Sequence, residues 1–276
     1  HARILYERIS QNEGAFHLSA AMCPEHRSSV LAEIRAQLER GEPCWLISTQ
    51  LIEAGVDVDF PVVFRSLAGL DAIAQAAGRC NRNGRLANGM TFVFRSEHRD
   101  SERFMLETSQ VADQLLGLGS TAPLFDDPLS LEAMERYFQL YYWNQQDRWD
   151  EKGIIRDTSI TSHNEFPFLF SFRDISKRFR LIEESGQPVI VPWGKEGRKL
   201  CNRLRFMKDS FDTRLLRKLQ RYTVQAPERQ WQCHLGLGIE MVHERYPVLI
   251  SPELHYDSQL GLVLDREDHS VDAFIV

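Results

Sequence analysis

The sequence predicts an α/β fold: a parallel sheet with helices on both faces, followed by a helical linker and a small α+β domain. Short, continuously apolar runs alternate with helical patterns between residues 15 and 94, which is typical of a parallel sheet with both faces buried. Residues 117–128 are then rich in Gly, Pro, Asp and Ser, as expected of a linker. The length of 276 residues is enough for two domains with cores of ordinary size.

Six elements define the predicted sheet. Apolar runs too short for helices predict its strands, and the helical spacing of Val30, Ile34 and Leu38 predicts its first helix, which Gly41 ends. Ligands of such sheets bind at the carboxyl ends of the strands, so the loops that follow strands are candidate sites. The predicted order is strand 15–19, helix 25–40, strand 44–47, strand 61–64, helix 70–79 and strand 90–94.

Two further helices are expected over residues 100–116 and 131–145. Asp127 and Ser130 are suitable caps for the second one. That helix is crowded with aromatic side chains, and two interpretations remain open. The rings dock the helix against the α/β core, or they stack on the bases of a nucleic acid.

The remaining chain has weaker patterns. The runs RFRLI (178–182) and PVIVPW (188–193) flank EESGQ and predict a β-hairpin. Residues 195–221 read as one or two helices capped by Asp212, and the short runs after Tyr222 predict a β-rich tail. The expected domains are 1–120, 121–219 and 220–276.

The cysteine pattern and the apolar runs restrict the class of protein. Five cysteines, none in a C-x-x-C pair, fit free thiols in a reducing cytoplasm rather than a disulfide framework or a zinc site. No apolar run reaches the ~18 residues of a membrane helix, so no membrane partner is expected. Glu53 is the only other carboxylate close to Asp57 and Asp59 and no His is near, so no metal site is predicted. Because the first residue is His1, the chain is expected to be a fragment or a processed product.

The charge of the chain is unevenly distributed. The net charge is −6, but residues 195–221 hold ten Lys or Arg against three carboxylates, which leaves −13 for the rest. One interpretation is a surface that faces a polyanion, in which Lys199, Arg203 and Arg205 contact DNA. The other is an ordinary solvated helical face.

The first motif, LISTQLIEAGVDVDF (46–60), runs from an apolar strand into a polar loop. Ser48 and Thr49 offer hydroxyls beside backbone N–H groups that can bind a strand phosphate. Gly55 permits a tight turn. Asp57 is placed to accept from a ribose hydroxyl or to hold an arginine.

The second motif, QAAGRCNRNGR (75–85), lies about 25 residues further on. Arg79 and Arg82 are three residues apart and can be aimed at one spot, where two guanidiniums suit the charge that spreads over a transferring phosphoryl group. Gln75, one helical turn earlier, can orient a water or touch the γ-phosphate. Gly78 lets a ligand approach the backbone closely.

These two motifs resemble motifs V and VI of superfamily-two helicases. Their residue patterns, T-Q-x-x-E-A-G-V-D-V-D-F and Q-A-A-G-R-x-N-R-x-G, are similar to those of the CRISPR-associated helicase-nuclease of type I systems. FHLSAAMCPEHR and LLRKLQRYTVQ resemble further segments of that family. The chain departs from the full family because it has no G-x-x-x-x-G-K-[ST] loop, no D-E-x-H box and no nuclease domain.

The resemblance implies a second RecA-like lobe with a C-terminal domain. Gln75, Arg79 and Arg82 would face the γ-phosphate of ATP, Thr49 would face the DNA backbone, and Gly55 and Asp57 would border the nucleotide cleft. ATP with Mg would be bound mainly by a first lobe that this chain lacks, and a divalent metal would belong to the equally absent nuclease domain. The implied partners are single-stranded DNA, the RNA-guided surveillance complex and an inhibitor protein of phage origin.

Three functional classes remain open at the level of sequence. The first is half of an ATP-dependent DNA translocase, inactive by itself as an ATPase or nuclease. The second is a non-catalytic module that binds the surveillance complex, DNA or an inhibitor. The third is the second lobe of another superfamily-two motor, such as an RNA helicase or a restriction translocase.

Overall fold

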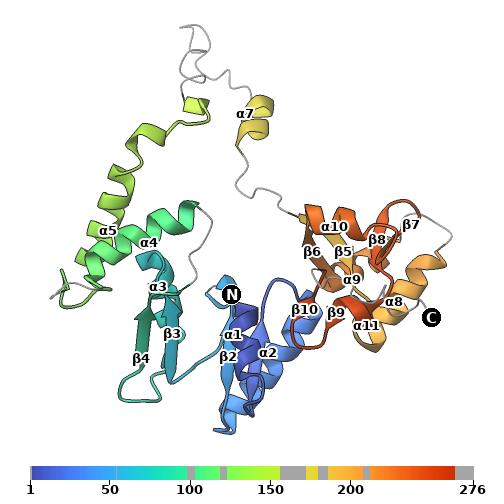
Figure 1. Cartoon of the computed structure of the whole chain (residues 1–276), viewed down its shortest axis with the longest axis horizontal. Helices are drawn as coiled ribbons and strands as arrows, with labels where there is room; N and C mark the ends of the chain where they lie inside the picture. Colours follow the sequence, from blue (N-terminus) through green and yellow to red (C-terminus); the bar gives the residue numbers. More distant parts are fainter. Residues whose placement is uncertain are drawn as a thin grey trace, which may run out of the picture. The chain divides into compact units, whose positions relative to one another are not determined.

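The computed structural model describes residues 2–53, 55–97, 103–118, 123–155, 172–179, 186–207 and 212–264. The chain divides into two compact units. Unit 1 comprises His1–Val58 and Ser185–Val276, and unit 2 comprises Asp59–Glu184. Figure 1 shows the elements of each unit.

Unit 1 begins with a small α/β segment. Its strands β1 and β2 pair in parallel, with Ala15 opposite Trp45, and α1 packs against both of them. Tyr6 on α1 shares a small core with Leu260 and Val263 from the end of the described chain. The elements are α1 (Ala2–Ile9), β1 (Ala15–Leu18), α2 (Pro24–Glu39), β2 (Trp45–Ser48) and the 3₁₀ turn η1 (Gln50–Ile52).

The second part of unit 1 is a mixed sheet with the strand order β6-β5-β8-β7. β5 pairs antiparallel with β6 and parallel with β8, and its buried face joins α8 and α9 in the largest core of the described chain. The elements are β5 (Gly186–Ile190), α8 (Gly194–Arg205), α9 (Thr213–Leu219), η3 (Gln220–Tyr222), β6 (Thr223–Pro227), α10 (Glu228–His234), β7 (Ile239–Val242), β8 (Tyr246–Leu249), α11 (Pro252–His255), β9 (Tyr256–Asp257) and β10 (Gly261–Leu262).

The two parts of unit 1 are joined at the start of α2. The Cys23 amide donates to the Tyr256 hydroxyl at 3.0 Å, and the Leu262 amide donates to the Ala21 carbonyl at 2.7 Å. An ion pair of 2.6 Å links Arg221 to Glu25. The end of the described chain is therefore packed against its beginning.

Unit 2 combines one parallel strand pair with helices. β3 and β4 pair with Val62 opposite Met90, and Leu70, Ala112 and Tyr137 from three helices form its core. The elements are β3 (Val62–Ser66), α3 (Leu70–Ala77), β4 (Met90–Phe94), α4 (Arg103–Leu116), α5 (Leu131–Trp143), η2 (Gln146–Arg148) and α7 (Phe172–Arg178).

The six elements predicted for the sheet are confirmed to within a few residues, and so is the parallel pairing. The described strands do not form one large sheet, however. β1–β2 and β3–β4 are separate two-stranded sheets, one in each unit. The aromatic helix does dock its Tyr137 face in a core, as one of its two interpretations predicts.

Ser130 and Asp212 are confirmed as caps, whereas Asp127 instead accepts from the Leu129 amide ahead of the helix at 2.9 Å. The predicted hairpin is wrong. Ser130 accepts from the Ala133 amide, and Asp212 accepts from the amides at the start of α9. β5 pairs with β6 and β8 instead of residues 178–182, of which 180–182 lie outside the described residues. No helix in the described part of the chain is long and apolar enough to cross a membrane.

Candidate functional site

The predicted phosphate-facing residues lie at the end of α3 and in the turn that follows it. Gln75 is exposed on the last helical turn, and Gly78 is the C-cap. Arg79 comes directly after the cap and is half-buried, whereas Arg82 is exposed. We call residues 78–86 the arginine turn.

Backbone hydrogen bonds hold the arginine turn against the segment that enters β3. The Phe60 amide donates to the Arg79 carbonyl at 2.9 Å, and the Asn81 amide donates back to the Phe60 carbonyl at 2.8 Å. The Asp59 carboxylate accepts from the amides of Arg82 at 2.7 Å and Asn83 at 3.2 Å. The conformation of the turn is therefore fixed on both sides of Arg82.

Asn81 gives the turn its shape. Its φ of 47° lies in the left-handed region, which Asn tolerates better than most residues. Its side-chain amide donates to the Leu86 carbonyl at 2.8 Å and its side-chain oxygen accepts from the Leu86 amide at 2.9 Å. The structural roles of Asn81 and Asp59 were not predicted from the sequence, although the Asn-x-x-Gly spacing is a typical turn signal.

The Arg82 side chain folds back over the helix end. Its Nη1 donates to the Gly78 carbonyl at 3.3 Å, where the helix dipole favours a cation. Gly78 itself has a helical φ of −65°, and a Cβ there would meet only ordinary contacts at 3.4 Å. The fold therefore tolerates a side chain at position 78. If glycine is required there, the reason is a ligand that approaches the backbone closely.

The predicted loop after β2 belongs to unit 1. The Ser48 hydroxyl lies 3.1 Å from the Leu18 carbonyl and 2.9 Å from the Thr49 carbonyl, so it is engaged within the loop. Thr49 is half-buried and is the N-cap of η1. Gly55 is exposed with a φ of 71°, and the Asp57 carbonyl accepts from Arg35 at 2.8 Å.

The structure therefore brings the candidate residues together in two groups. The residues of the arginine turn are neighbours in unit 2, and the residues of the loop after β2 are neighbours in unit 1. Within the described ranges, no group of three or more His, Cys, Asp or Glu side chains could hold a metal ion.

The predicted DNA-contacting residues lie on α8 in unit 1. Arg203 pairs with Asp212 at 2.7 Å, and Arg205 pairs with Glu240 at 3.1 Å, whereas Lys199 is exposed. Within residues 195–221, two helices carry six exposed cations that have no ion pair among the described contacts. They are Lys195, Arg198 and Lys199 on α8, with Arg214, Arg217 and Lys218 on α9.

Comparisons with known proteins show similarity to one family over the N-terminal part of the chain. Residues 1–85 match the family described as CRISPR-associated nuclease/helicase Cas3, C-terminal. The chain is 58% identical over 55 residues to Cas3 of Haloferax volcanii, and 33% identical over 81 residues to Cas3 of Methanothermobacter thermautotrophicus. These stretches cover 20% and 29% of this chain but only 6% and 10% of those proteins. Over residues 1–85 the chain is thus similar to the C-terminal region of the CRISPR-associated nuclease/helicase Cas3, which confirms the resemblance of the two motifs.

Solved structures agree at the level of the fold. The crystal structure of T. fusca Cas3-ADP aligns with a TM-score of 0.53 at 16% identity, and that of T. fusca Cas3-ATP with 0.51 at 14%. Each alignment covers 90% of this chain and 34% of the T. fusca protein. This chain therefore spans about a third of the length of these structures.

Proposed function

We propose that the chain is the second RecA-like lobe and C-terminal part of an ATP-dependent translocase for single-stranded DNA, in a helicase-nuclease of cytoplasmic CRISPR interference. In this proposal β1–β4 belong to one RecA-like lobe, and the domain boundaries at residues 120 and 219 stay predictions. The observation that carries the proposal is the arginine turn, in which backbone bonds fix Arg79 and Arg82 beside Gln75.

The arginine turn suits a phosphoryl group that is held elsewhere. Arg82 is exposed, and the Asp59 bonds to the backbone amides fix the position of its backbone in the turn. The chain contains no Walker A loop. ATP with Mg would therefore be bound mainly by a first lobe, with Gly55, Asp57 and Gly78 bordering the cleft, and the divalent metal would sit in a separate nuclease domain. A type I surveillance complex and an inhibitor protein remain proposed partners.

A radiolabelled ATP hydrolysis assay with single-stranded DNA tests the proposal. The chain alone should hydrolyse no ATP, whereas a polypeptide that joins it to a first helicase lobe and a nuclease domain should. In that polypeptide, Arg82→Ala should lower kcat by about 10³-fold, the effect expected of an arginine finger. Arg85→Ala is the matched control, because Arg85 is exposed in the same turn. Turnover by the isolated chain, or equal losses in both variants, would contradict the proposal.

The DNA path is proposed to run along α8. The triple variant Lys199→Ala, Arg203→Ala, Arg205→Ala should bind a single-stranded oligonucleotide more weakly and with a flatter salt dependence. Because Arg203 and Arg205 already have acidic partners, Lys199 should account for the larger share. A control with Arg8 on α1 and Arg40, the C-cap of α2, replaced by Ala should keep the original salt slope. Stimulation of ATP hydrolysis by single-stranded DNA but not by RNA would separate this motor from an RNA helicase.

A further inference from the structure

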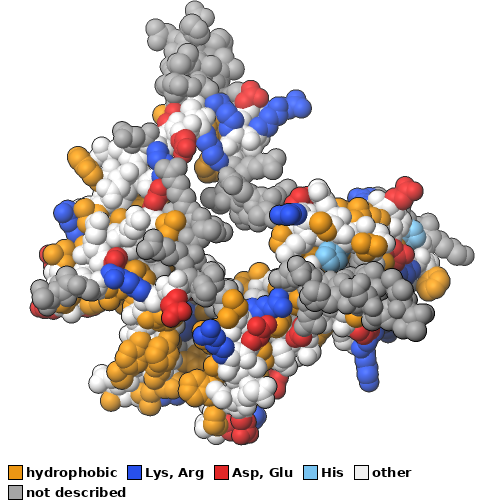
Figure 2. Space-filling model, in the orientation of Figure 1, with side chains coloured by type: hydrophobic (Ala, Val, Ile, Leu, Met, Phe, Trp, Pro, Cys, Tyr) orange, Lys and Arg blue, Asp and Glu red, His pale blue; other side chains and the backbone are white. Residues whose placement is uncertain are grey.

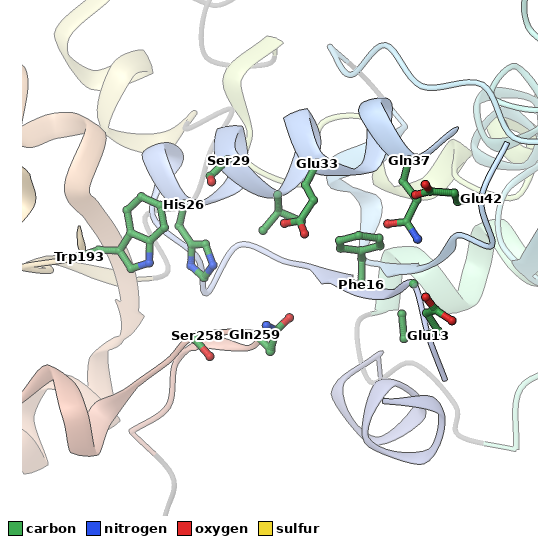
Figure 3. Close-up of a pocket in the computed structure, with 13 residues that line it drawn as sticks. Glu13, Phe16, His26, Ser29, Glu33, Gln37, Glu42, Trp193, Ser258 and Gln259 are labelled. Atoms are coloured by element: carbon green, nitrogen blue, oxygen red, sulfur yellow. The ribbon is translucent and has the colours of Figure 1, made fainter. Parts of the chain in front are cut away.

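Unit 1 contains a groove that the proposed motor function does not use. It has a volume of about 560 Å³ and lies between α2 and the segment that carries Ser258 and Gln259 (Figure 3). Its floor includes Phe16 on β1, and Trp193 stands at the end where α2 begins.

The charged side chains of the groove are all acidic. Glu13, Glu33 and Glu42 line it, and no Lys or Arg does. Arg40 binds Glu42 through two contacts of 2.7 Å. Glu13 and Glu33 are exposed, and neither makes a hydrogen bond or an ion pair among the described contacts. Two carboxylates are therefore available to a cationic ligand, whereas a phosphate would be repelled.

The other end of the groove is aromatic. The rings of His26 and Trp193 stack with centroids 4.7 Å apart and planes at 20°. His26 is buried, and its Nδ1 lies 3.0 Å from the Tyr256 hydroxyl, which fixes the ring that supports Trp193. Burial lowers the pKa of His26, so this end carries no positive charge at neutral pH. A half-buried indole of this kind attracts a guanidinium by cation–π interaction.

The length of the groove excludes a small cation as its whole ligand. The lining residues of α2 run from His26 to Gln37, which is about 17 Å of helix. An extended peptide covers that distance with about five residues. We infer that the groove binds an extended, arginine-bearing segment of a partner protein, with guanidiniums on Glu13 and Glu33 and one over Trp193. This inference goes beyond the proposed function and does not depend on it.

Fluorescence anisotropy tests the inference with a defined probe. The probe is a fluorescein-labelled nine-residue peptide in which three arginines alternate with Gly and Ser. The double variant Glu13→Gln, Glu33→Gln should bind it about tenfold more weakly, because charge-assisted hydrogen bonds are lost. Trp193→Leu should weaken binding severalfold, with its melting temperature measured alongside to confirm folding.

Two controls separate the groove from general attraction to an acidic protein. The double variant Glu39→Gln, Glu253→Gln removes two exposed carboxylates outside the groove and should bind the peptide within about twofold of the unchanged chain. A peptide with citrulline in place of arginine should not bind. Equal losses in both double variants, equal binding of the citrulline peptide, or no binding of the arginine peptide would each overturn the inference.

Discussion

The four-stranded sheet of unit 1 and the β3–β4 pair of unit 2 differ in how they treat their apolar side chains. Val189, Val248 and Leu249 in the four-stranded sheet are fully buried. On β3 and β4, by contrast, Phe64 is 66% exposed and Phe92 is 42% exposed, and their rings stack on each other. Figure 2 shows hydrophobic side chains gathered over these two strands.

This difference shows which sheet is buried by elements of its own unit. The four-stranded sheet has helices and further strands to cover it, so it builds a core of its own. Among the described residues, the β3–β4 pair packs Val93 against the helical core and leaves Phe64 and Phe92 exposed, and two strands are marginally stable alone. Unit 2, which carries the arginine turn, is therefore the unit with more unburied apolar surface on its strands.

The largest expected effect comes from truncating one side chain in each sheet. Leu249→Ala should lower the free energy of unfolding of unit 1 by about 2–5 kcal/mol, because it leaves a cavity in a closed core. Phe64→Ala should change that of unit 2 by less than about 1 kcal/mol, because the ring is mostly in water. Urea denaturation followed by circular dichroism measures both. Equal losses would show that the face of β3 and β4 is covered in solution.

Buried Tyr137 and partly buried Tyr256 provide a second comparison of the two units. Tyr256→Phe should destabilise unit 1 by about 1–3 kcal/mol, because it leaves the Cys23 amide and the His26 ring without their partner. Tyr137→Phe in unit 2 removes the 3.3 Å hydrogen bond to Asp71, and should cost about 0.5–1.5 kcal/mol. Thermal melts of the two variants decide the order, and a larger loss for Tyr137→Phe would reverse it.

The free energy of unfolding of unit 1 should depend on pH. Burial lowers the pKa of both His17 and His26, although backbone hydrogen bonds partly oppose it. The unfolded chain then binds more protons than the folded one. The stabilisation is present above the unfolded pKa of about 6.5 and is lost as the pH falls through the lower folded pKa.

Urea titrations at pH 7.5, 6.5 and 5.5 measure this effect. Unit 1 should lose stability as the pH falls, and the double variant His17→Gln, His26→Gln should have a flatter dependence. The two histidines of unit 2, His98 and His163, lie outside the described residues. A slope unchanged in the double variant would contradict the assignment.

Local signals were sufficient for much of this fold. The apolar run Met90–Phe94 predicted β4 to the residue, and Ser130 and Asp212 cap the helices for which their side chains suited them. A helix cap forms hydrogen bonds with amides no more than three residues away, so a short stretch of sequence contains all the residues that form it.

Long-range contacts were not visible in the same way. β5 has a partner on each edge, and those strands lie far along the chain, so a pattern of adjacent runs wrongly suggested a hairpin. Arg205 meets Glu240, 35 residues away, which no count of local charge could show. The arginine turn lies between these two cases. Its residue types could be recognised in the sequence, but the hydrogen bonds to Asp59 that hold it became visible only in the structure.

The smallest effect on stability is expected at Gly78, and there it is informative. Gly78→Ala should leave the free energy of unfolding unchanged or raise it by up to about 1 kcal/mol, because its backbone is helical and a Cβ has room. If ATP approaches this backbone closely, the same variant in the complete motor should still lose hydrolysis. Paired measurements of urea stability and ATP turnover therefore separate a fold requirement from a ligand requirement. Full turnover in a stable Gly78→Ala variant would remove Gly78 from the proposed cleft while leaving the two arginines in place.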